Sequence, residues 1–257
     1  MENNFYNIFD SHAHYDDKWF DEDREILLSS MKENGVCGIV NNSVDLKTAK
    51  VCIDFCEKYD FMYGAVGFHP ENLEDMPNDY LDRAAELLKH KKIVAVGETG
   101  LDYHWDISKD LQNRVFEEQI KLSLDVNMPI IVHDREAHGD TLNYLRKYKP
   151  KALVHCFSGS VEMMREVMRY GSYISLGGVV TFKNARHSVE VAKEVPIDRL
   201  LLETDCPYMS PVPFRGKRCD STMIKYTAEK IAEIRNTDVQ ELLNITAENA
   251  KRFYGID

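Results

Sequence analysis

The stretch FDSHAHYDD, residues 9–17, places two histidines two positions apart at the end of the first apolar segment of the chain. Alternate side chains of an extended strand point to the same side, so His12 and His14 face one cation-sized space. The apolar residues NIF before the pair and the acidic residues after it indicate the carboxyl end of a first strand. Parallel α/β folds place their chemistry at such ends, although an isolated H-x-H pair is often only two solvated histidines.

The rest of the chain repeats one unit, a short apolar run rich in β-branched residues followed by a longer amphipathic stretch. This pattern predicts strands at residues 6–9, 38–41, 62–66, 93–96, 129–132, 152–154, 173–176 and 200–202. Eight such units within 257 residues favour a single (β/α)8 TIM barrel, residues 1–257, over an open doubly wound sheet. No G-x-G-x-x-G turn follows the first strand, which argues against dinucleotide binding. Extra C-terminal helices are predicted at residues 222–235, 238–244 and 247–254.

The charge balance restricts the partners that this protein can attract. Its 32 basic and 43 acidic residues give a formal net charge of −11, which argues against broad electrostatic attraction to nucleic acid. A polyanionic substrate would therefore need local positive charge, from a basic patch or from metal ions. The 6 cysteines form no paired C-x-x-C pattern, and neither a secretory leader nor a membrane-spanning apolar run is evident. We expect a reduced, cytoplasmic, monomeric protein without membrane contact.

Polar residues follow the later predicted strands at the same point as the first pair. Taken singly, each has an ordinary structural explanation as a core histidine, a helix cap or a turn residue. A barrel brings these strand ends to one face. Burying an unpaired charge there costs several kcal/mol per group, and metal coordination is the simplest way to offset that cost. The residues are His69 in GFHP, Glu98 and Asp102 in GETGLDY, His133 and Arg135 in HDREAH, His155 in HCFSGS, Lys183 in LGGVVTFK, and Glu203 and Asp205 in ETDCPY.

Six of the strand-end residues have the chemistry of metal ligands. Three or four with a water complete one catalytic site, whereas six with a shared carboxylate suit two ions. Glu98 is central in chain order and can bridge, and Asp205 can join the first histidine pair and take a proton from water. The mixture of imidazole and carboxylate suits zinc, magnesium or manganese. The predicted ligands are His12, His14, Glu98, His133, His155 and Asp205.

The ordered motifs FDSHAH, GFHP, GETGLDY, HDREA, HCFSG, GVVTFK and ETDCPYMSPVPFRGKR run from about residue 9 to residue 218, and TAENAKRFYG continues them. This set resembles the TatD family of metal-dependent deoxyribonucleases, within the amidohydrolase-like barrels. The resemblance implies hydrolysis of DNA phosphodiester bonds, often as a 3′-5′ exonuclease, with divalent metal ions. It assigns the same six residues to the metals and places His69 and Glu203 close to the reaction centre. Cys206, Cys219, Asp220 and Ser221 depart from the family pattern.

We expect two divalent ions and a metal-activated water to attack the phosphodiester in line. Asp205 and Glu98 would act on the water, and His69 would contact the phosphate or protonate the leaving oxygen. An acidic body with a small basic mouth predicts engagement of single-stranded DNA or 3′ ends. The predicted substrate contacts are His69, Lys183, Glu203, Arg215, Lys217 and Arg218.

Further contacts and other functions stay open at this point. Arg135 could meet phosphate or pair with a neighbouring carboxylate, and Phe68, Tyr103, Trp105, Phe182 and Phe214 lie in loops where rings can stack on bases. The same metal chemistry would serve an amide or ester hydrolase acting on a small molecule or an aminoacyl-tRNA. A non-catalytic metal-binding scaffold is the third alternative, although a purely structural zinc site usually closes with four ligands and no water.

Overall fold

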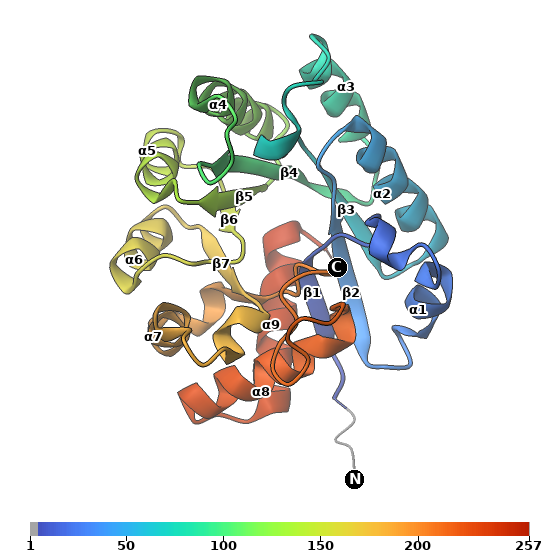
Figure 1. Ribbon diagram of the computed structural model, residues 1–257, viewed down its shortest axis with the longest axis vertical. Helices are drawn as coiled ribbons and strands as arrows, with labels where there is room; N and C mark the ends of the chain where they lie inside the picture. Colours follow the sequence, from blue (N-terminus) through green and yellow to red (C-terminus); the bar gives the residue numbers. More distant parts are fainter. Residues whose placement is uncertain (1–4, 257) are drawn as a thin grey trace.

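A near-closed barrel of eight parallel strands forms the centre of the molecule in the computed structural model, which describes residues 5–256. The strands neighbour one another in sequence order, and Figure 1 shows them ringed by helices. This arrangement confirms the predicted (β/α)8 TIM barrel. The strands are β1 Ile8–Ala13, β2 Val36–Asn42, β3 Met62–Val66, β4 Ile93–Asp102, β5 Ile130–Arg135, β6 Ala152–Val154, β7 Tyr173–Leu176 and β8 Leu200–Leu202.

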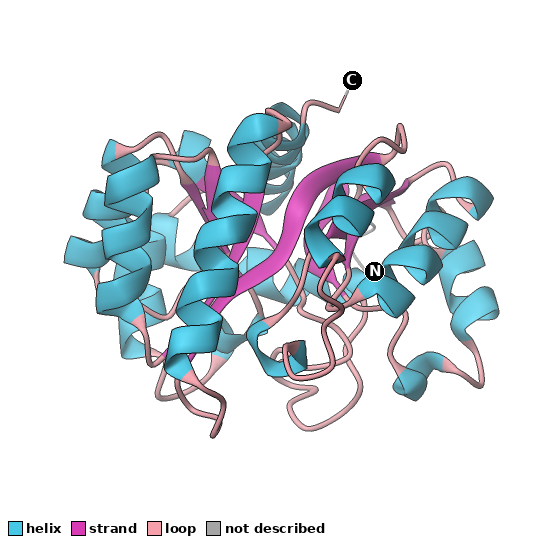
Figure 2. Cartoon of the chain, turned by 90° about the horizontal axis from the view of Figure 1, so that it is seen from above, coloured by secondary structure: helices cyan, strands magenta, loops and turns pink. Residues whose placement is uncertain are grey.

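Helices lie on the outside of the strands, as Figure 2 shows. The α-helices are α1 Arg24–Ser30, α2 Leu46–Lys58, α3 Tyr80–Leu87, α4 Lys109–Asp125, α5 His138–Tyr148, α6 Val161–Arg169, α7 Arg186–Glu194, α8 Ile224–Arg235 and α9 Val239–Tyr254. Short 3-10 helices are η1 Lys18–Phe20, η2 Pro70–Asn72, η3 Gly178–Thr181, η4 Ile197–Arg199 and η5 Ser221–Met223. Among the helices in residues 5–256, none is long and apolar enough to cross a membrane.

Several elements are longer than the sequence pattern predicts. The first, fourth and fifth strands continue past their apolar segments, so His12, Glu98 and His133 lie inside strands rather than after them. The parallel ladder between β4 and β5 extends over this region, with Gly100 paired to His133 and Asp102 to Arg135. The last two predicted helices are one continuous helix, α9, in which Thr246 Oγ1 donates a hydrogen bond to the Leu242 carbonyl.

The barrel closes between its first and last strands at the predicted ligand residues. The backbone N–H of Asp205 donates to the carbonyl of His12 at 3.0 Å, and that of His14 donates to the carbonyl of Cys206 at 2.9 Å. A bridge between Ala13 and Cys206 completes the seam. Closure therefore fixes His12, His14 and Asp205 relative to one another through the backbone.

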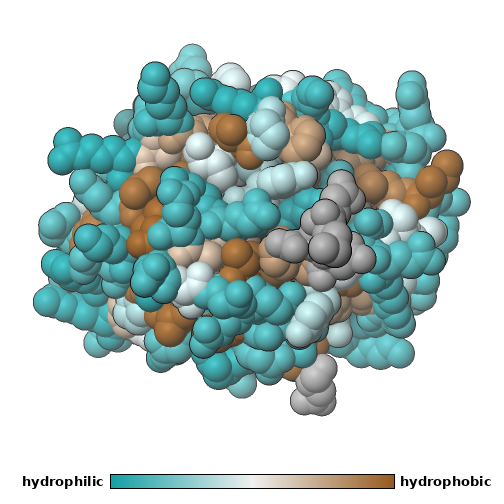
Figure 3. Space-filling view, turned by 90° about the horizontal axis from the view of Figure 1, so that it is seen from below, coloured by the Kyte–Doolittle hydropathy of each residue, from teal (hydrophilic) through white to brown (hydrophobic). Residues whose placement is uncertain are grey.

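One apolar layer fills the barrel beneath the polar residues. Each strand contributes one buried side chain to this layer, and Phe253 and Tyr254 of α9 pack against it. The layer consists of Phe9, Val40, Ala65, Ala95, Ile131, Leu153, Tyr173 and Leu201. The outer surface contrasts with it, because the face in Figure 3 is mostly hydrophilic with small separate apolar areas.

Candidate metal centre

Strand periodicity places part of the polar cluster directly above the apolar layer. Side chains two positions apart point to the same side of a strand, so His133 follows Ile131 into the barrel. By the same spacing, a second histidine and a glutamate follow the layer residues of β6 and β8. They are His155, after Leu153, and Glu203, after Leu201.

Two ligands do not follow this alternation. His12 lies three positions after Phe9 and Glu98 three positions after Ala95, so regular strands would turn both outward. The strand register shifts at both places, between Asp10 and Ala13 of β1 and between Val96 and Thr99 of β4. Gly97, with φ of 148°, precedes Glu98 in a conformation that favours glycine. These irregularities aim His12 and Glu98 into the cluster.

The two carboxylate oxygens of Glu98 face two different sets of histidines. Oε2 lies 3.3 Å from Nε2 of His12 and 3.2 Å from Nε2 of His14. Oε1 lies 3.0 Å from Nδ1 of His133 and 2.8 Å from Nε2 of His155. Because Glu98 is 2% exposed, its charge depends on these neighbours rather than on solvent. Glu98 therefore contacts four histidines of the cluster, two through each carboxylate oxygen.

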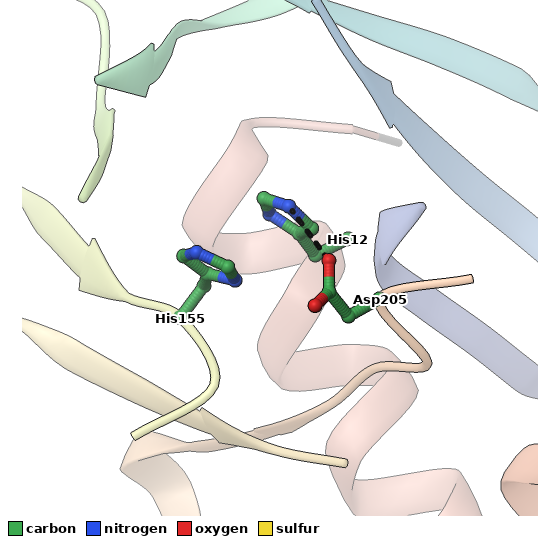
Figure 4. Close-up of side chains that lie close together, drawn as sticks. All are labelled: His12, His155 and Asp205. Carbon is green, nitrogen blue, oxygen red and sulfur yellow. Dashed lines mark ion pairs between the residues drawn. The ribbon is translucent and has the colours of Figure 1, made fainter. Parts of the chain in front are cut away.

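Asp205 joins the cluster from the loop after β8. Its Oδ1 lies 3.5 Å from Nε2 of His14 and 3.7 Å from Nε2 of His12. Figure 4 shows His12, His155 and Asp205 converging from separate elements of the barrel. The rings of His12 and His155 stack with centroids 3.8 Å apart. All six predicted ligands therefore belong to one connected set of His, Glu and Asp groups with metal-ligand spacing.

Hydrogen bonds outside the cluster fix the tautomers of two histidines. Nδ1 of His14 lies 3.0 Å from the carbonyl oxygen of Asn42, which only accepts, so Nδ1 carries the proton. Nε2 of His133 lies 3.0 Å from Oδ2 of Asp102, which places the proton of that ring on Nε2. In their neutral forms, His14 and His133 therefore turn bare nitrogen lone pairs toward Glu98. This is the arrangement of metal-ligating histidines held by acceptor groups.

A cation between these histidines and Glu98 would reduce the electrostatic repulsion among them. Lone pairs of imidazole nitrogens that face carboxylate oxygens at 3.0 to 3.2 Å repel one another unless positive charge lies between them. Burial disfavours the protonated rings, yet hydrogen bonds to carboxylates outweigh it. Those to Asp102 and Glu98 raise the pKa of His133 to about 10, and those to Asp205 and Glu98 raise the pKa of His14 well above its usual value. The carboxylates that favour protons on these rings would equally favour a divalent cation, which competes with protons for the imidazole nitrogens.

His69 differs from His14 and His133 because its protonated ring nitrogen, not its bare one, faces Glu98. Its Nδ1 accepts a hydrogen bond from the backbone N–H of Glu71 at 3.2 Å, so the neutral ring carries its proton on Nε2. Nε2 lies 3.4 Å from Oε1 of Glu98. Burial lowers the pKa of His69, which keeps the ring neutral. His69 therefore presents an N–H group, not a lone pair, to the centre of the site.

The cluster opens into a cavity of about 790 Å³. Its walls differ in character: Asp16, Asp17 and Glu71 lie on the side of β1 and β3, whereas an apolar side includes Phe157, Val179 and Val180. The remaining rim carries Trp105 and Arg135, from the ends of β4 and β5. A volume of this size is typical of small-ligand sites.

The predicted basic contacts lie outside the cavity lining in residues 5–256. Arg218 is held by Asp23, with donor–acceptor distances of 2.7 and 2.6 Å, and also donates to the carbonyl of Trp19. The guanidinium of Arg215 lies over the ring of Phe182 at 4.4 Å, and Nζ of Lys217 lies 6.0 Å from the Phe214 ring. Their contact with substrate, like that of Lys183, stays a prediction.

Glu203 is fully buried below the cavity. Its Oε1 accepts from the backbone N–H of Cys156 at 2.6 Å and its Oε2 from the hydroxyl of Ser175 at 2.5 Å. Burial raises the pKa of Glu203 to about 7. Both oxygens therefore accept hydrogen bonds within the protein, one from the residue after His155 and one from β7. Contact of Glu203 with substrate stays a prediction.

Sequence patterns did not identify the groups that position the ligands. Asp102 was visible in GETGLDY, but its role depends on the register between β4 and β5. Asp10, which is fully buried, accepts from the backbone N–H groups of His12 and Thr204 and from the hydroxyls of Thr204 and Ser221. The sequence signal for Asp10 is its place two residues before His12, on the buried end of the first strand.

Comparisons with known proteins agree with this geometry. The family model described as "TatD related DNase" matches residues 9–255. A metal-dependent hydrolase of Bacillus subtilis, YabD, is 46% identical over 97% of this chain and 100% of its own length. The human "3'-5' RNA nuclease TATDN2" is 29% identical over 97% of this chain and 35% of its own length. The crystal structure of the TatD homologue YjjV from Escherichia coli superposes with a TM-score of 0.90 at 27% identity, covering 98% of this chain and 99% of that one.

The family match covers nearly the whole chain, and the barrel brings the His, Glu and Asp ligand groups together at one end. The protein is therefore a member of the TatD-related DNase family, a metal-dependent hydrolase built on the amidohydrolase type of TIM barrel.

Proposed function

We propose that this protein is a metal-dependent deoxyribonuclease that removes nucleotides from the 3′ ends of single-stranded DNA with two divalent ions. The observation that carries the proposal is the position of Glu98, whose two oxygens face separate histidine pairs. His12, His14 and Asp205 would hold one ion, and His133 and His155 the other, with Glu98 shared. Two ions about 3.5 to 4 Å apart are the usual device for in-line displacement at phosphorus.

The bound ions would supply positive charge for the phosphate oxygens and lower the pKa of a water molecule. Asp205 would accept the proton of that water, a role supported by its position at the cavity with a side chain 17% exposed. Nε2–H of His69 would donate to a phosphate or leaving oxygen. Asp102 holds the tautomer of His133 during the reaction.

Charge and shape support an end-directed action on a single strand. The net charge of −11 and the acidic side of the cavity oppose the wrapping of a duplex. A cavity of about 790 Å³ is suited to a strand end rather than to a continuous helix. Lys183, Arg215, Lys217 and Arg218 are the proposed outer contacts to the strand. The description of the matched family and the 3′-5′ nuclease among the relatives support the choice of a phosphodiester.

Digestion of end-labelled oligonucleotides by the metal-reconstituted protein tests the proposal. Single-stranded DNA, single-stranded RNA and blunt duplex DNA are compared, each labelled at either the 5′ or the 3′ end, with magnesium, manganese or zinc. Glu98→Gln serves as the inactive variant, because it keeps the side-chain shape and removes the charge. Asp106→Ala, an exposed residue of the loop after β4, serves as the matched control.

The proposal predicts a ladder of shortening 5′-labelled single strands that the Glu98→Gln protein does not produce. Internal cuts in duplex DNA would contradict the end-directed action. Full activity of the Glu98→Gln protein would contradict the assigned site. Hydrolysis of p-nitrophenyl esters without cleavage of any nucleic acid would instead indicate an amide or ester hydrolase.

A further inference from the structure

We propose that Arg135 and Trp105 bind the nucleotide next to the scissile phosphodiester, Arg135 through its phosphate and Trp105 through its base. This inference rests on the proposed nuclease function. It adds the residues that guide the strand to the metal centre. They add an inner strand contact at the ends of β4 and β5 to the outer contacts proposed on the basic loop after β8.

The distribution of charge around the cavity singles out Arg135. Within residues 5–256, it is the one lysine or arginine among the residues that line the cavity. Asp16, Asp17 and Glu71 also line the cavity, after β1 and β3, and repel phosphate. Asp134, next to Arg135 in the lining, is 3% exposed and is paired with His138 at 2.8 Å. A polyanionic strand can therefore approach the centre favourably past Arg135.

Strand geometry puts Arg135 at a suitable distance from the metal centre. Arg135 ends β5 two residues after His133, so both side chains start on the same side of the strand. Two residues along a parallel strand span about 6.6 Å. The guanidinium lies beside the metal centre rather than on it, because Nη1 is 3.9 Å from Oδ2 of Asp102, the oxygen that accepts from Nε2 of His133 at 3.0 Å. From there it can hold a neighbouring phosphate without displacing the reacting one.

The hydrogen-bonding groups of Arg135 are available. Nη1 forms a long ion pair with Oδ2 of Asp102, at 3.9 Å, which is too long for a hydrogen bond, and the side chain is 46% exposed. The oxygens of Asp102 accept from Nε2 of His133 at 3.0 Å and from the backbone N–H of His104 at 2.9 Å. The N–H groups of Arg135 are therefore free to donate to a phosphate. Arg218, by contrast, is fully engaged with Asp23.

Trp105 supplies a stacking surface beside this cation. It is 48% exposed and lines the cavity, and its ring centroid lies 5.9 Å from the guanidinium carbon of Arg135. The edge contact with the ring of His104, at 5.2 Å between centroids, leaves much of the indole uncovered. An exposed ring next to an arginine is the combination that binds single-stranded nucleic acid through base stacking and a phosphate contact.

Kinetics of single-strand cleavage by four variants test the proposal: Arg135→Ala, Arg135→Lys, Trp105→Ala and Trp105→Phe. The matched control is Arg165→Ala, which removes an exposed arginine paired with Glu194 at 3.4 Å on the outer helices. Hydrolysis of bis(p-nitrophenyl) phosphate measures the metal centre without a strand. It also shows whether each variant is folded.

The Arg135→Ala protein should have a KM for single-stranded DNA raised about 10-fold or more, with Arg135→Lys intermediate. The dependence of log(kcat/KM) on log[salt] should become shallower by about 0.7, the value for one lost phosphate contact on a single strand. Trp105→Ala should raise KM about 5-fold to 150-fold, the value of one lost base-stacking contact. Trp105→Phe keeps an aromatic ring and should raise KM less. Turnover of bis(p-nitrophenyl) phosphate should stay within about 2-fold in all four, because that small diester needs neither contact.

An unchanged KM and salt slope in the Arg135→Ala protein, while the wild type cleaves DNA, would overturn this proposal and leave the nuclease function intact. If the salt slope falls in a combined Arg215→Ala, Lys217→Ala and Arg218→Ala protein but is unchanged in Arg135→Ala, the strand is held by the basic loop alone and this proposal is overturned. Absence of nucleic acid cleavage by the wild type would overturn the proposed function and this inference together.

Discussion

Asp102 accepts a hydrogen bond from Nε2 of His133 at 3.0 Å and so decides which nitrogen of that ring faces the metal centre. With the proton held on the Asp102 side, Nδ1 of His133 points at Oε1 of Glu98, 3.0 Å away. The carbonyl of Asn42 does the same for His14. Hydrogen-bond acceptors outside the cluster thus fix which histidine nitrogens turn their lone pairs toward Glu98. The Asp102 acceptor is a side chain and can be tested by substitution.

Replacement of Asp102 by alanine should weaken metal binding. Loss of the acceptor frees the tautomer of His133, and changes of this kind typically cost about 10-fold to 100-fold in metal affinity or activity. Titration with a fluorescent metal competitor, together with turnover of bis(p-nitrophenyl) phosphate, measures both effects. Asp106→Ala, in the loop after β4, should change neither, and equal affinity of the Asp102→Ala and wild-type proteins would refute the positioning role.

Metal binding should release protons near neutral pH. The pKa of His133 in the metal-free protein is about 10, and that of His14 lies well above its usual value, so both rings are protonated before an ion enters. A ligand must be deprotonated to bind, so affinity rises with pH toward about 10. Calorimetric titrations in buffers with different ionisation enthalpies count the protons. A binding enthalpy that is the same in every buffer would contradict this.

The stability gained from metal should grow with pH. The raised pKa values of His14 and His133 stabilise the metal-free fold fully below their unfolded value, about 6.5, and this contribution is lost as pH rises toward about 10. Bound ions replace the protons and stabilise the fold in proportion to their affinity. The difference in Tm between metal-loaded and chelated protein should therefore be larger at about pH 9 than at about pH 6.5. A difference that shrinks with pH would argue against protons and metal sharing one site.

Replacement of Glu203 by alanine should destabilise the fold. It leaves the backbone N–H of Cys156 and the hydroxyl of Ser175 buried without acceptors, at about 1 to 3 kcal/mol each. Glu203→Gln keeps one acceptor oxygen and should lose about half as much. Urea unfolding measures both, with the exposed Glu190→Ala as control. A Glu203→Ala protein as stable as the wild type would show that these hydrogen bonds contribute nothing.

The sequence predicted the barrel and the proximity of the six candidate ligands because both depend on local patterns. Apolar runs mark the inner layer of the strands, and polar residues after them mark the barrel mouth. The His133 and His155 positions follow directly from strand alternation. His12 and Glu98 do not, because they face inward only through register shifts that depend on neighbouring strands.

Contacts between distant segments were beyond the reach of sequence patterns. The basic loop after β8 lies near the barrel mouth in chain order, yet Arg218 pairs with Asp23, which is 195 positions away. The partnership of Asp102 with His133 likewise depends on how β4 and β5 pair. Such positions are set by tertiary packing, and no local spacing encodes them.

The position of Glu98 between two cation sites is most directly tested by anomalous diffraction from crystals soaked in manganese. The account predicts two anomalous peaks, one beside Oε2 with His12 and His14, and one beside Oε1 with His133 and His155. The peaks should lie about 3.5 to 4 Å apart. A single peak, or peaks that leave either oxygen of Glu98 without an ion, would contradict the two-ion centre.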